Sequence, residues 1–314
     1  MRVLVAGGFG FVGGRVAQAL ASAGHTVVLG TRQTRPHSDW LQAGIVQCLD
    51  WENPSQLCQA CHGVAAIVHA AGMNAADCAA DAAAALHVNG VYSARLVQAA
   101  IDAGVARFFY FSTAHVYASP LAGNIDEQTC PRNMHPYATS HLAGEHALLH
   151  ALQRGALHGS VLRLSNGFGR PAQAAADCWG LLANELCRQA VVQRKLVLRS
   201  GGAQLRDFIP LSAVCADVQS LLRCPADQLP PILNMVSAEA ISVAGMASLI
   251  QQRCALTLGY TPPLEYGQGI EPSPSLRMNS LHAQHLQLAR PVDLASELDE
   301  LLAFCCTQYE GRLQ

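Results

Sequence analysis

The sequence predicts an α/β protein built on a doubly wound parallel sheet, with a small C-terminal α/β subdomain added to it. Three observations lead to this fold class. Short apolar segments alternate with Ala- and Leu-rich segments through the first half of the chain, a glycine-rich turn joins the first of each, and the pattern changes after Leu164. Such alternation is typical of parallel strands joined by right-handed helical crossovers that cover both faces of the sheet.

Strands are expected where short, largely apolar and often β-branched runs end at glycine or polar residues. These runs are Arg2–Ala6, Thr26–Leu29, Ile45–Cys48, Ala65–His69, Phe108–Ser112 and Ser160–Leu164. Their nearly continuous apolar character fits a sheet that is buried on both faces. Alanine and leucine, which favour helix, dominate the segments between them. The expected helices are Phe11–Ala23, Ser55–Ala60, Ala75–Ala103 and Pro136–Gln153.

After Leu164, loops with glycine and proline become frequent and the predicted helices become shorter. These helices are Cys178–Gln193, Leu211–Leu222, Ser242–Cys254 and Val292–Cys305. We expect residues 1–164 to form the core domain. We expect residues 165–314 to form mainly the subdomain, with some segments returning to the core.

The composition excludes several classes of protein. Of the 314 residues, 51% are hydrophobic and 13% are charged, which excludes a disordered chain. A formal net charge of −2 argues against a dedicated nucleic-acid binder or a binder of anionic membranes. The apolar stretch Val91–Phe111 is broken by three charged residues, so no transmembrane helix is expected. The N-terminus reads as a strand entering a turn rather than as a signal peptide, which predicts a soluble cytoplasmic protein.

The twelve cysteines are expected to be mostly small buried hydrophobes, as in other proteins of reducing compartments. The segment Cys58-Gln59-Ala60-Cys61-His62 has the spacing of a haem attachment site. That attachment requires export, so we favour a chance spacing on a helix. A zinc site would need a second pair of ligands at suitable spacing, and no metal is therefore expected.

The segment from Gly7 to Gly13 carries the strongest functional signal. It follows the first strand, opens the first helix and has glycine at its first, fourth and seventh positions. Such a turn needs positive φ, a backbone that can approach a pyrophosphate, and close packing of helix on strand. The helix N-terminus then faces the phosphate charge. We interpret the segment as a Rossmann-type dinucleotide site, and its expected contacts are Gly7, Gly10, Phe11, Val12 and Gly13.

The end of the second strand distinguishes NAD from NADP. NAD sites usually place an acidic residue there, on the ribose 2′-hydroxyl. This chain has Thr31 and Arg32 at that point and no acidic residue. A guanidinium can pair with a 2′-phosphate, and Arg35 could assist, so NADP is favoured over NAD. An exposed arginine without a ligand is the alternative interpretation of Arg32.

Further motifs follow the glycine-rich turn, among them Asp50-Trp51, His69-Ala70-Ala71-Gly72, Val88-Asn89-Gly90 and Arg163-Leu164-Ser165-Asn166. With them, the chain resembles the extended short-chain dehydrogenase/reductase family, in particular the nucleotide-sugar epimerases and dehydratases. The resemblance covers nearly the whole chain and implies a Rossmann core with a C-terminal substrate-binding subdomain. The cofactor contacts that it implies are Asp50, Trp51, Ala70, Ala71, Asn89, Tyr137 and His141. The substrate contacts that it implies are Asn166, Arg206 in Arg206-Asp207-Phe208, and Arg277, and the two arginines would hold a diphosphate.

The same resemblance assigns the chemistry to two hydroxyl groups. Tyr137, which follows Pro136, would exchange a proton with a sugar hydroxyl, and Thr113 would hydrogen-bond and orient the same oxygen. His115 follows Thr113 at the carboxyl end of a strand, where ligands bind in open α/β sheets. Substrate contact and loop structure both remain open for His115.

One position departs from the pattern of the family. The family signature is Tyr-x-x-x-Lys, whereas this chain reads Tyr137-Ala138-Thr139-Ser140-His141. Residues four apart share a helix face, so His141 is expected where the lysine would lie. The lysine lowers the tyrosine pKa by its positive charge, but a histidine with an ordinary pKa of about 6.5 is mostly neutral at pH 7. Either His141 substitutes for the lysine, or a neutral Tyr137 only donates a proton, or the protein binds a dinucleotide without catalysis.

The favoured function is NAD(P)-dependent redox chemistry on a nucleotide-linked sugar, as a 4-epimerase, a dehydratase or a 4-keto reductase. A non-catalytic NADP-binding scaffold or sensor, and a reductase of a small non-nucleotide carbonyl compound, are the alternatives. Members of the family commonly dimerise through two long helices. The resemblance therefore implies a homodimer that is built from Ala75–Ala103 and Pro136–Gln153.

Overall fold

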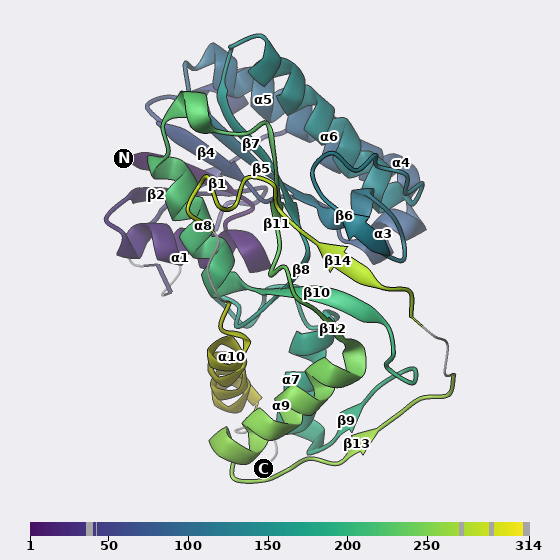
Figure 1. Ribbon diagram of the computed structural model, residues 1–314. Helices are drawn as coiled ribbons and strands as arrows, with labels where there is room; N and C mark the ends of the chain where they lie inside the picture. Colours follow the sequence, from purple (N-terminus) through teal and green to yellow (C-terminus); the bar gives the residue numbers. More distant parts are fainter. Residues whose placement is uncertain (36–39, 42, 270–272, 289–291, 310–314) are drawn as a thin grey trace.

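A seven-stranded sheet, in which every neighbouring pair of strands is parallel, forms the centre of the protein (Figure 1). The computed structural model describes residues 1–35, 40–41, 43–269, 273–288 and 292–309. In spatial order the strands are β11 (Ile232–Met235), β7 (His158–Leu164), β5 (Arg107–Thr113), β4 (Ala66–His69), β1 (Arg2–Ala6), β2 (Thr26–Thr31) and β3 (Ile45–Cys48). The strand order reverses between β1 and β4, beside the glycine-rich turn, which confirms the predicted doubly wound fold.

Apolar side chains on both faces of the sheet hold the helices in place. Along β1, Val3 and Val5 belong to one core, and Leu4 and Ala6 belong to the other, because side chains alternate along a strand. The first core includes α1 (Phe11–Ser22) and α8 (Leu211–Arg223). The second includes α2 (Pro54–Cys61), α5 (Tyr92–Asp102) and α6 (Pro136–Gln153). Burial on both faces explains why the strands are apolar throughout.

The prediction of a single helix over residues 75–103 is wrong. The structure has α3 (Ala75–Ala80), α4 (Ala82–Ala85), the π-helical segment η1 (Leu86–Val91) and then α5. Between α3 and α4, Asp81 is extended, with φ −143° and ψ 93°, and its Oδ1 accepts a hydrogen bond of 2.9 Å from the backbone N–H of Ala84. A short carboxylate competes with the helix in this way because it reaches nearby backbone donors.

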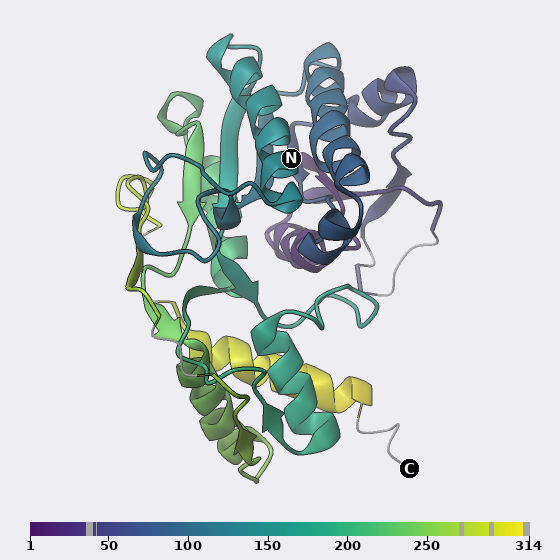
Figure 2. The same cartoon turned by 90° about the vertical axis from the view of Figure 1, so that its right-hand side faces the viewer.

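Three helices form a second body beside the sheet, around a core of their own (Figures 1 and 2). They are α7 (Leu182–Gln193), α9 (Val243–Thr257) and α10 (Leu294–Tyr309). Short strands connect this body to the sheet: β8 (Asn166–Phe168) pairs with β10 (Leu205–Pro210), which pairs with β12 (Ala240–Ser242). Two further pairs are β9 (Leu196–Val197) with β13 (Leu264–Glu265), and β6 (Gly123–Ile125) with β14 (Leu276–Met278). The sequence predicts none of these strands.

The chain returns to the sheet through α8 and β11. β11 pairs with β7, and Leu233 and Met235 enter the same core as α1. Only four residues form this strand and Asn234 interrupts their apolar run, so periodicity alone does not reveal it. Two 3₁₀ turns, η2 (Ala114–Val116) and η3 (Ala226–Gln228), complete the set of elements. Within the described part of the chain, every helix is too short or too polar to cross a membrane.

Candidate active site

The glycine-rich turn has the shape that a dinucleotide phosphate requires. Gly7 has φ +80°, and a Cβ on Gly7 would lie 2.7 Å from the backbone N of Ala71. A Cβ on Gly13 would clash with the carbonyl of Gly7. Helix α1 begins at Phe11 without a side-chain cap and without an acidic residue in its first turn. Its first N–H groups and its dipole are therefore left for an anion, so the residues present fit a dinucleotide.

Residues 173–177, which no motif in the sequence singles out, lie against this turn. Gln173 donates a hydrogen bond of 2.8 Å from Nε2 to the carbonyl of Phe9. Asp177 accepts one of 3.0 Å at Oδ2 from Nδ2 of Asn74, which follows strand β4. Asn74 also lines the cavity described below. The pairing joins residues 103 positions apart, so no local pattern in the sequence could reveal it.

The residues predicted for the adenosine end of the cofactor lie at the ends of β2 and β3. Arg32 is exposed, and Thr31 accepts a hydrogen bond at Oγ1 from the backbone of Gln33. Trp51 is buried and stacks on Tyr92, with ring centroids 5.4 Å apart and an interplanar angle of 18°. Asp50 accepts a backbone hydrogen bond from the second residue after it. Arg32 thus has an exposed side chain that a ligand can reach, whereas Trp51 is part of the core.

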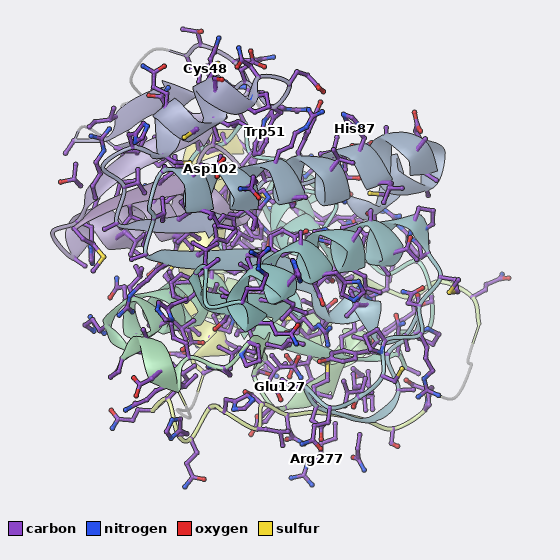
Figure 3. All side chains as sticks on the ribbon, turned by 90° about the horizontal axis from the view of Figure 1, so that it is seen from above. Cys48, Trp51, His87, Asp102, Glu127 and Arg277 are labelled. Carbon is purple, nitrogen blue, oxygen red and sulfur yellow. The ribbon has the colours of Figure 1, made fainter. Side chains whose placement is uncertain are left out.

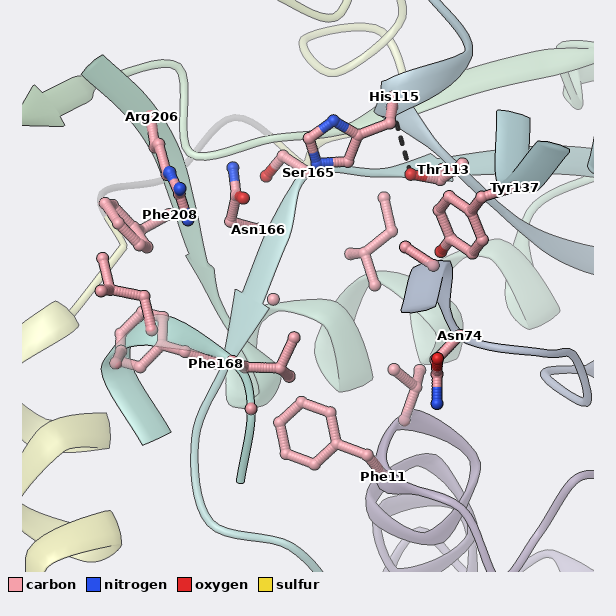
Figure 4. A pocket seen from close by; sticks show the side chains of 18 of the residues that line it. Phe11, Asn74, Thr113, His115, Tyr137, Ser165, Asn166, Phe168, Arg206 and Phe208 are labelled. Atoms are coloured by element: carbon pink, nitrogen blue, oxygen red, sulfur yellow. Dashed lines mark hydrogen bonds between the residues drawn. The ribbon is translucent and has the colours of Figure 1, made fainter. Parts of the chain in front are cut away.

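One cavity of about 380 Å³ brings together seven of the predicted site residues (Figure 4). Its wall extends from the start of α1 to β10, across the carboxyl ends of the strands. The predicted residues that line it are Phe11, Val12, Thr113, His115, Tyr137, Asn166 and Arg206. The remainder of its wall is largely apolar, with Leu164, Phe168, Leu181 and Phe208 among its members.

Local structure fixes the two catalytic hydroxyls that the sequence predicts. Thr113 ends β5 and accepts a hydrogen bond of 3.1 Å at Oγ1 from the backbone N–H of His115, which caps η2. Tyr137 stands in the first turn of α6, after Pro136, and its N–H donates to Nδ1 of His135 at 3.1 Å. Burial raises the pKa of Tyr137, and a hydrogen bond with the Thr113 side chain partly offsets the rise. The phenol is therefore protonated at neutral pH.

His141 lies one turn further along α6, against the ring of Tyr137. The two ring centroids are 4.7 Å apart and the interplanar angle is 74°. His141 is 6% exposed, and burial lowers its pKa to about 4. Nδ1 lies 2.9 Å from Oη of Tyr110. The residue in the place of the lysine is therefore a neutral imidazole at pH 7.

Asn89 lies behind the cavity. It stands in η1 and is completely buried. Its Oδ1 accepts a hydrogen bond of 2.8 Å from the backbone of Met73, and its Nδ2 donates one of 3.0 Å to Oγ of Ser140. The amide joins the segment after β4 to α6, so its polar atoms are used within the protein. Asn89 is outside the walls of both cavities, and its contact with the cofactor stays a prediction.

A second cavity of about 290 Å³ shares three residues with the first: His115, Asn166 and Arg206. Nδ2 of Asn166 donates to the carbonyl of Asp207 at 2.9 Å. Arg206 donates from Nε and from an Nη atom to Oε1 of Gln204, at 3.2 and 2.9 Å. Burial lowers the pKa of Arg206 and also that of His115, which Arg206 lowers further. This end of the site combines a guanidinium with neutral donors.

Arg277 is not brought to either cavity. It lies on β14 and is exposed, and neither cavity has it in its wall. In the view of Figure 3 it stands at the rim of the molecule, far from Trp51. The substrate contact predicted for Arg277 therefore finds no support in its position.

Comparison with curated proteins identifies relatives that match part of this chain. A UDP-glucose 4-epimerase of Rhizobium meliloti is 28% identical over 181 residues, which are 56% of this chain and 55% of the relative. A dTDP-6-deoxy-L-talose 4-dehydrogenase (NAD(P)(+)) of Kitasatospora kifunensis is 29% identical over 191 residues, 58% of each chain. The chain thus matches a little over half the length of these curated relatives.

Solved structures share the fold over 98% of the chain. MoeE5 in complex with UDP-glucose and NAD has a TM-score of 0.81 at 24% identity, covering 98% of this chain and 99% of that one. The UDP-glucose 4-epimerase of Thermotoga maritima, with UDP-glucose, has a TM-score of 0.81 at 18% identity and the same coverage. The resemblance inferred from the motifs is confirmed by the family model that matches residues 3–218. On that match, which extends over most of the chain, the protein belongs to the NAD dependent epimerase/dehydratase family.

Proposed function

We propose that this protein is an NAD(P)-dependent oxidoreductase that acts on a nucleotide-linked sugar, as a 4-epimerase, a dehydratase or a 4-keto reductase. One observation carries the proposal. The hydroxyl of Tyr137 faces a cavity whose wall begins at Phe11, at the N-terminus of α1, and ends at Arg206 on β10. A dinucleotide phosphate suits the first end, and a substrate diphosphate suits the second.

In this function Tyr137 moves the proton and Thr113 positions it. A bound nicotinamide dinucleotide would supply or accept the hydride. Tyr137 donates its phenolic proton to the carbonyl oxygen of the sugar in the reductive direction. The Thr113 hydroxyl, which is close enough to lower the pKa of Tyr137, donates to the same oxygen and stabilises the charge that develops there.

NADP is the proposed cofactor because Arg32 is the exposed charged side chain at the end of β2. A 2′-phosphate carries the charge and the acceptor oxygens that a guanidinium fork binds. The solved structure of MoeE5 named above contains NAD, so NAD is the alternative cofactor. Discrimination between the two dinucleotides is therefore a direct test of Arg32.

For the substrate, we propose contacts from His115, Asn166 and Arg206, the three residues that line both cavities. Arg206 alone supplies a full positive charge among them. Its guanidinium is already oriented by Gln204. Arg277 is left out of this set because it lies outside both cavities.

We also propose a homodimer formed through η1, α5 and α6. Leu86 and Val91 of η1 are 52% and 38% exposed, and exposed apolar side chains of this size suit a contact between subunits. Light scattering of the purified protein measures the mass directly. A value near the 33.3 kDa of one chain would contradict the dimer.

The decisive experiment is mass spectrometry of the purified protein under non-denaturing conditions, followed by assays with the molecules that it retains. Retention of a dinucleotide together with a nucleotide sugar, and turnover of that sugar, supports the proposal. Retention of a dinucleotide with no turnover of any nucleotide sugar contradicts it and favours a scaffold or sensor. Turnover of small carbonyl compounds alone favours a different reductase.

A further inference from the structure

His141 offers one ring nitrogen to the protein and leaves the other free. Nδ1 lies 2.9 Å from Oη of Tyr110, a residue in the middle of β5 that is 1% exposed. The two rings lie at 30° to each other with centroids 6.0 Å apart. No group of the described residues hydrogen-bonds Nε2. Nδ1 of His69 is a fully buried atom without a hydrogen-bond partner, whereas Nε2 of His141 is not fully buried. Nε2 is therefore the nitrogen available to a ligand.

The neighbours of Tyr110 decide where its single proton goes. Besides Nδ1 of His141, its hydroxyl lies 3.3 Å from the carbonyl of Asn89 and within reach of Ser93. The Asn89 carbonyl already accepts a hydrogen bond of 2.6 Å from Oγ of Ser93. Ser93 has then given its only proton and accepts from Nε2 of His69, 2.9 Å away. The Asn89 carbonyl keeps a second lone pair, but it lies 3.3 Å from Oη of Tyr110, whereas Nδ1 of His141 lies at 2.9 Å and is the nearer acceptor.

Acid strength points in the same direction as distance. A phenol is a far stronger acid than the N–H of a neutral imidazole, and an imidazole nitrogen accepts more strongly than a phenol oxygen. The pair is therefore most stable with the O–H of Tyr110 donating to Nδ1 of His141. The tautomer of a histidine is set by the hydrogen bond that its other nitrogen makes. The proton of the neutral His141 ring therefore lies on Nε2.

We propose that Tyr110 is a positioning residue, which holds His141 in the Nε2–H tautomer so that the imidazole presents a neutral hydrogen-bond donor to an oxygen of the bound dinucleotide. The inference rests on the proposed function for the identity of that ligand. In this arrangement His141 offers an uncharged donor where the family signature has the charged donor of a lysine. Tyr110, which stands on β5, fixes the direction of that donor. The opposite tautomer would present a lone pair instead and would repel an oxygen acceptor.

The experiment measures the tautomer and the affinity separately. Histidine side chains labelled with ¹⁵N are followed by NMR at pH 7 in the native protein, and the His141 signals are assigned by their loss in His141→Gln. The same spectra are recorded for Tyr110→Phe and for the matched control Tyr117→Phe. Tyr117 is also buried, but its hydroxyl donates to Asn234 and not to a histidine. Binding of NADPH and of NADH is measured for each protein by fluorescence.

The native protein is expected to show His141 with its proton on Nε2 alone. Tyr110→Phe is expected to give a mixture of tautomers and a dissociation constant about tenfold higher for the dinucleotide, the upper end for one hydrogen bond. Tyr117→Phe should leave both unchanged. A native His141 protonated on Nδ1 overturns the inference, even if Tyr110→Phe does not fold. Absence of any dinucleotide binding in the native protein contradicts the proposed function instead, while the NMR result still decides the tautomer.

Discussion

The phenol ring of Tyr137 and the imidazole of His141 meet edge to face, with their centroids 4.7 Å apart. Burial raises the pKa of the phenol and lowers the pKa of the imidazole to about 4. A positive charge on His141 would stabilise a phenolate, but His141 is charged only in acid, where the phenol keeps its proton. The pair therefore suits a tyrosine that donates a proton better than one that removes a proton.

Substitution Tyr137→Phe should abolish turnover and leave the affinity for the dinucleotide nearly unchanged. Only the group that transfers the proton is removed, while the ring that contacts His141 stays. Steady-state rates and a fluorescence titration with NADPH test the two halves. Turnover at the native rate would leave the proposed site without its proton donor.

Substitution Thr113→Val should lower turnover by about 10²-fold, the loss typical of one hydrogen-bond donor to a developing oxyanion. Thr113 also caps η2 through its Oγ1, so the variant loses a structural contact as well. Thr113→Ser is the matched control, because it keeps the hydroxyl and should retain most of the rate. Equal losses in the two variants would assign Thr113 to structure alone.

Substitution Arg32→Ala should weaken NADPH by about tenfold or more and change NADH little, since a charge-assisted hydrogen bond to the 2′-phosphate is lost. The control is Arg199→Ala, whose side chain is 84% exposed and pairs with Glu185 in the other body. Dissociation constants for both dinucleotides decide the matter. Native affinities that are equal for NADPH and NADH, and unchanged in Arg32→Ala, would refute the choice of NADP.

Sequence reasoning succeeds where the physical cause is local. Strand β1 is predicted at its observed bounds because its apolar run ends at a glycine turn, and that turn needs only three glycines to be recognised. The sequence does not predict features that depend on contacts between segments far apart in the chain. The charged pair Arg206-Asp207 hides strand β10, because Asp207 becomes tolerable in the core only through Ser165 and Ser237 from other segments.

The same distinction applies to the site. The motifs single out Thr113 and Tyr137, and both residues line one cavity. Thr113 ends strand β5, and Tyr137 stands in the first turn of helix α6. Asn74 enters the cavity wall through a contact with Asp177 across 103 positions, which no motif contains. Arg277 stands on β14, which pairs with the distant strand β6, so its position relative to the two cavities could not be derived from the sequence around it.

Two buried neutral histidines should make the protein less stable in mild acid. Burial lowers the pKa of His69 to about 3 and that of His141 to about 4, whereas both take up a proton near pH 6.5 in the unfolded chain. Their contribution to stability is therefore complete above about pH 6.5 and is lost as pH falls towards these lower values. For His141 the loss is about 3 kcal/mol at about 1.4 kcal/mol for each unit.

Urea unfolding between pH 7.5 and pH 4.5 measures this loss. His69→Gln should show a shallower fall in the free energy of unfolding than the native protein, because one titrating group is gone. His150→Gln, which removes an exposed imidazole from α6, is the control and should follow the native slope. The same slope in His69→Gln and in the native protein would mean that His69 takes up its proton equally well when folded.

The last prediction concerns the direction of catalysis. Because neither Tyr137 nor His141 is ionised at neutral pH in this site, carbonyl reduction should be more efficient than alcohol oxidation at pH 7. His141→Lys should raise the oxidation rate and move its pH optimum downward, since a fixed positive charge beside the phenol stabilises the phenolate that oxidation requires. Reduction should gain little, because it needs a protonated tyrosine. Both directions are measured across pH for the native protein and the variant on one substrate pair, with His141→Gln as the uncharged control. A lysine variant that oxidises no better than the native protein, with the same pH profile, would show that position 141 does not set the proton affinity of Tyr137.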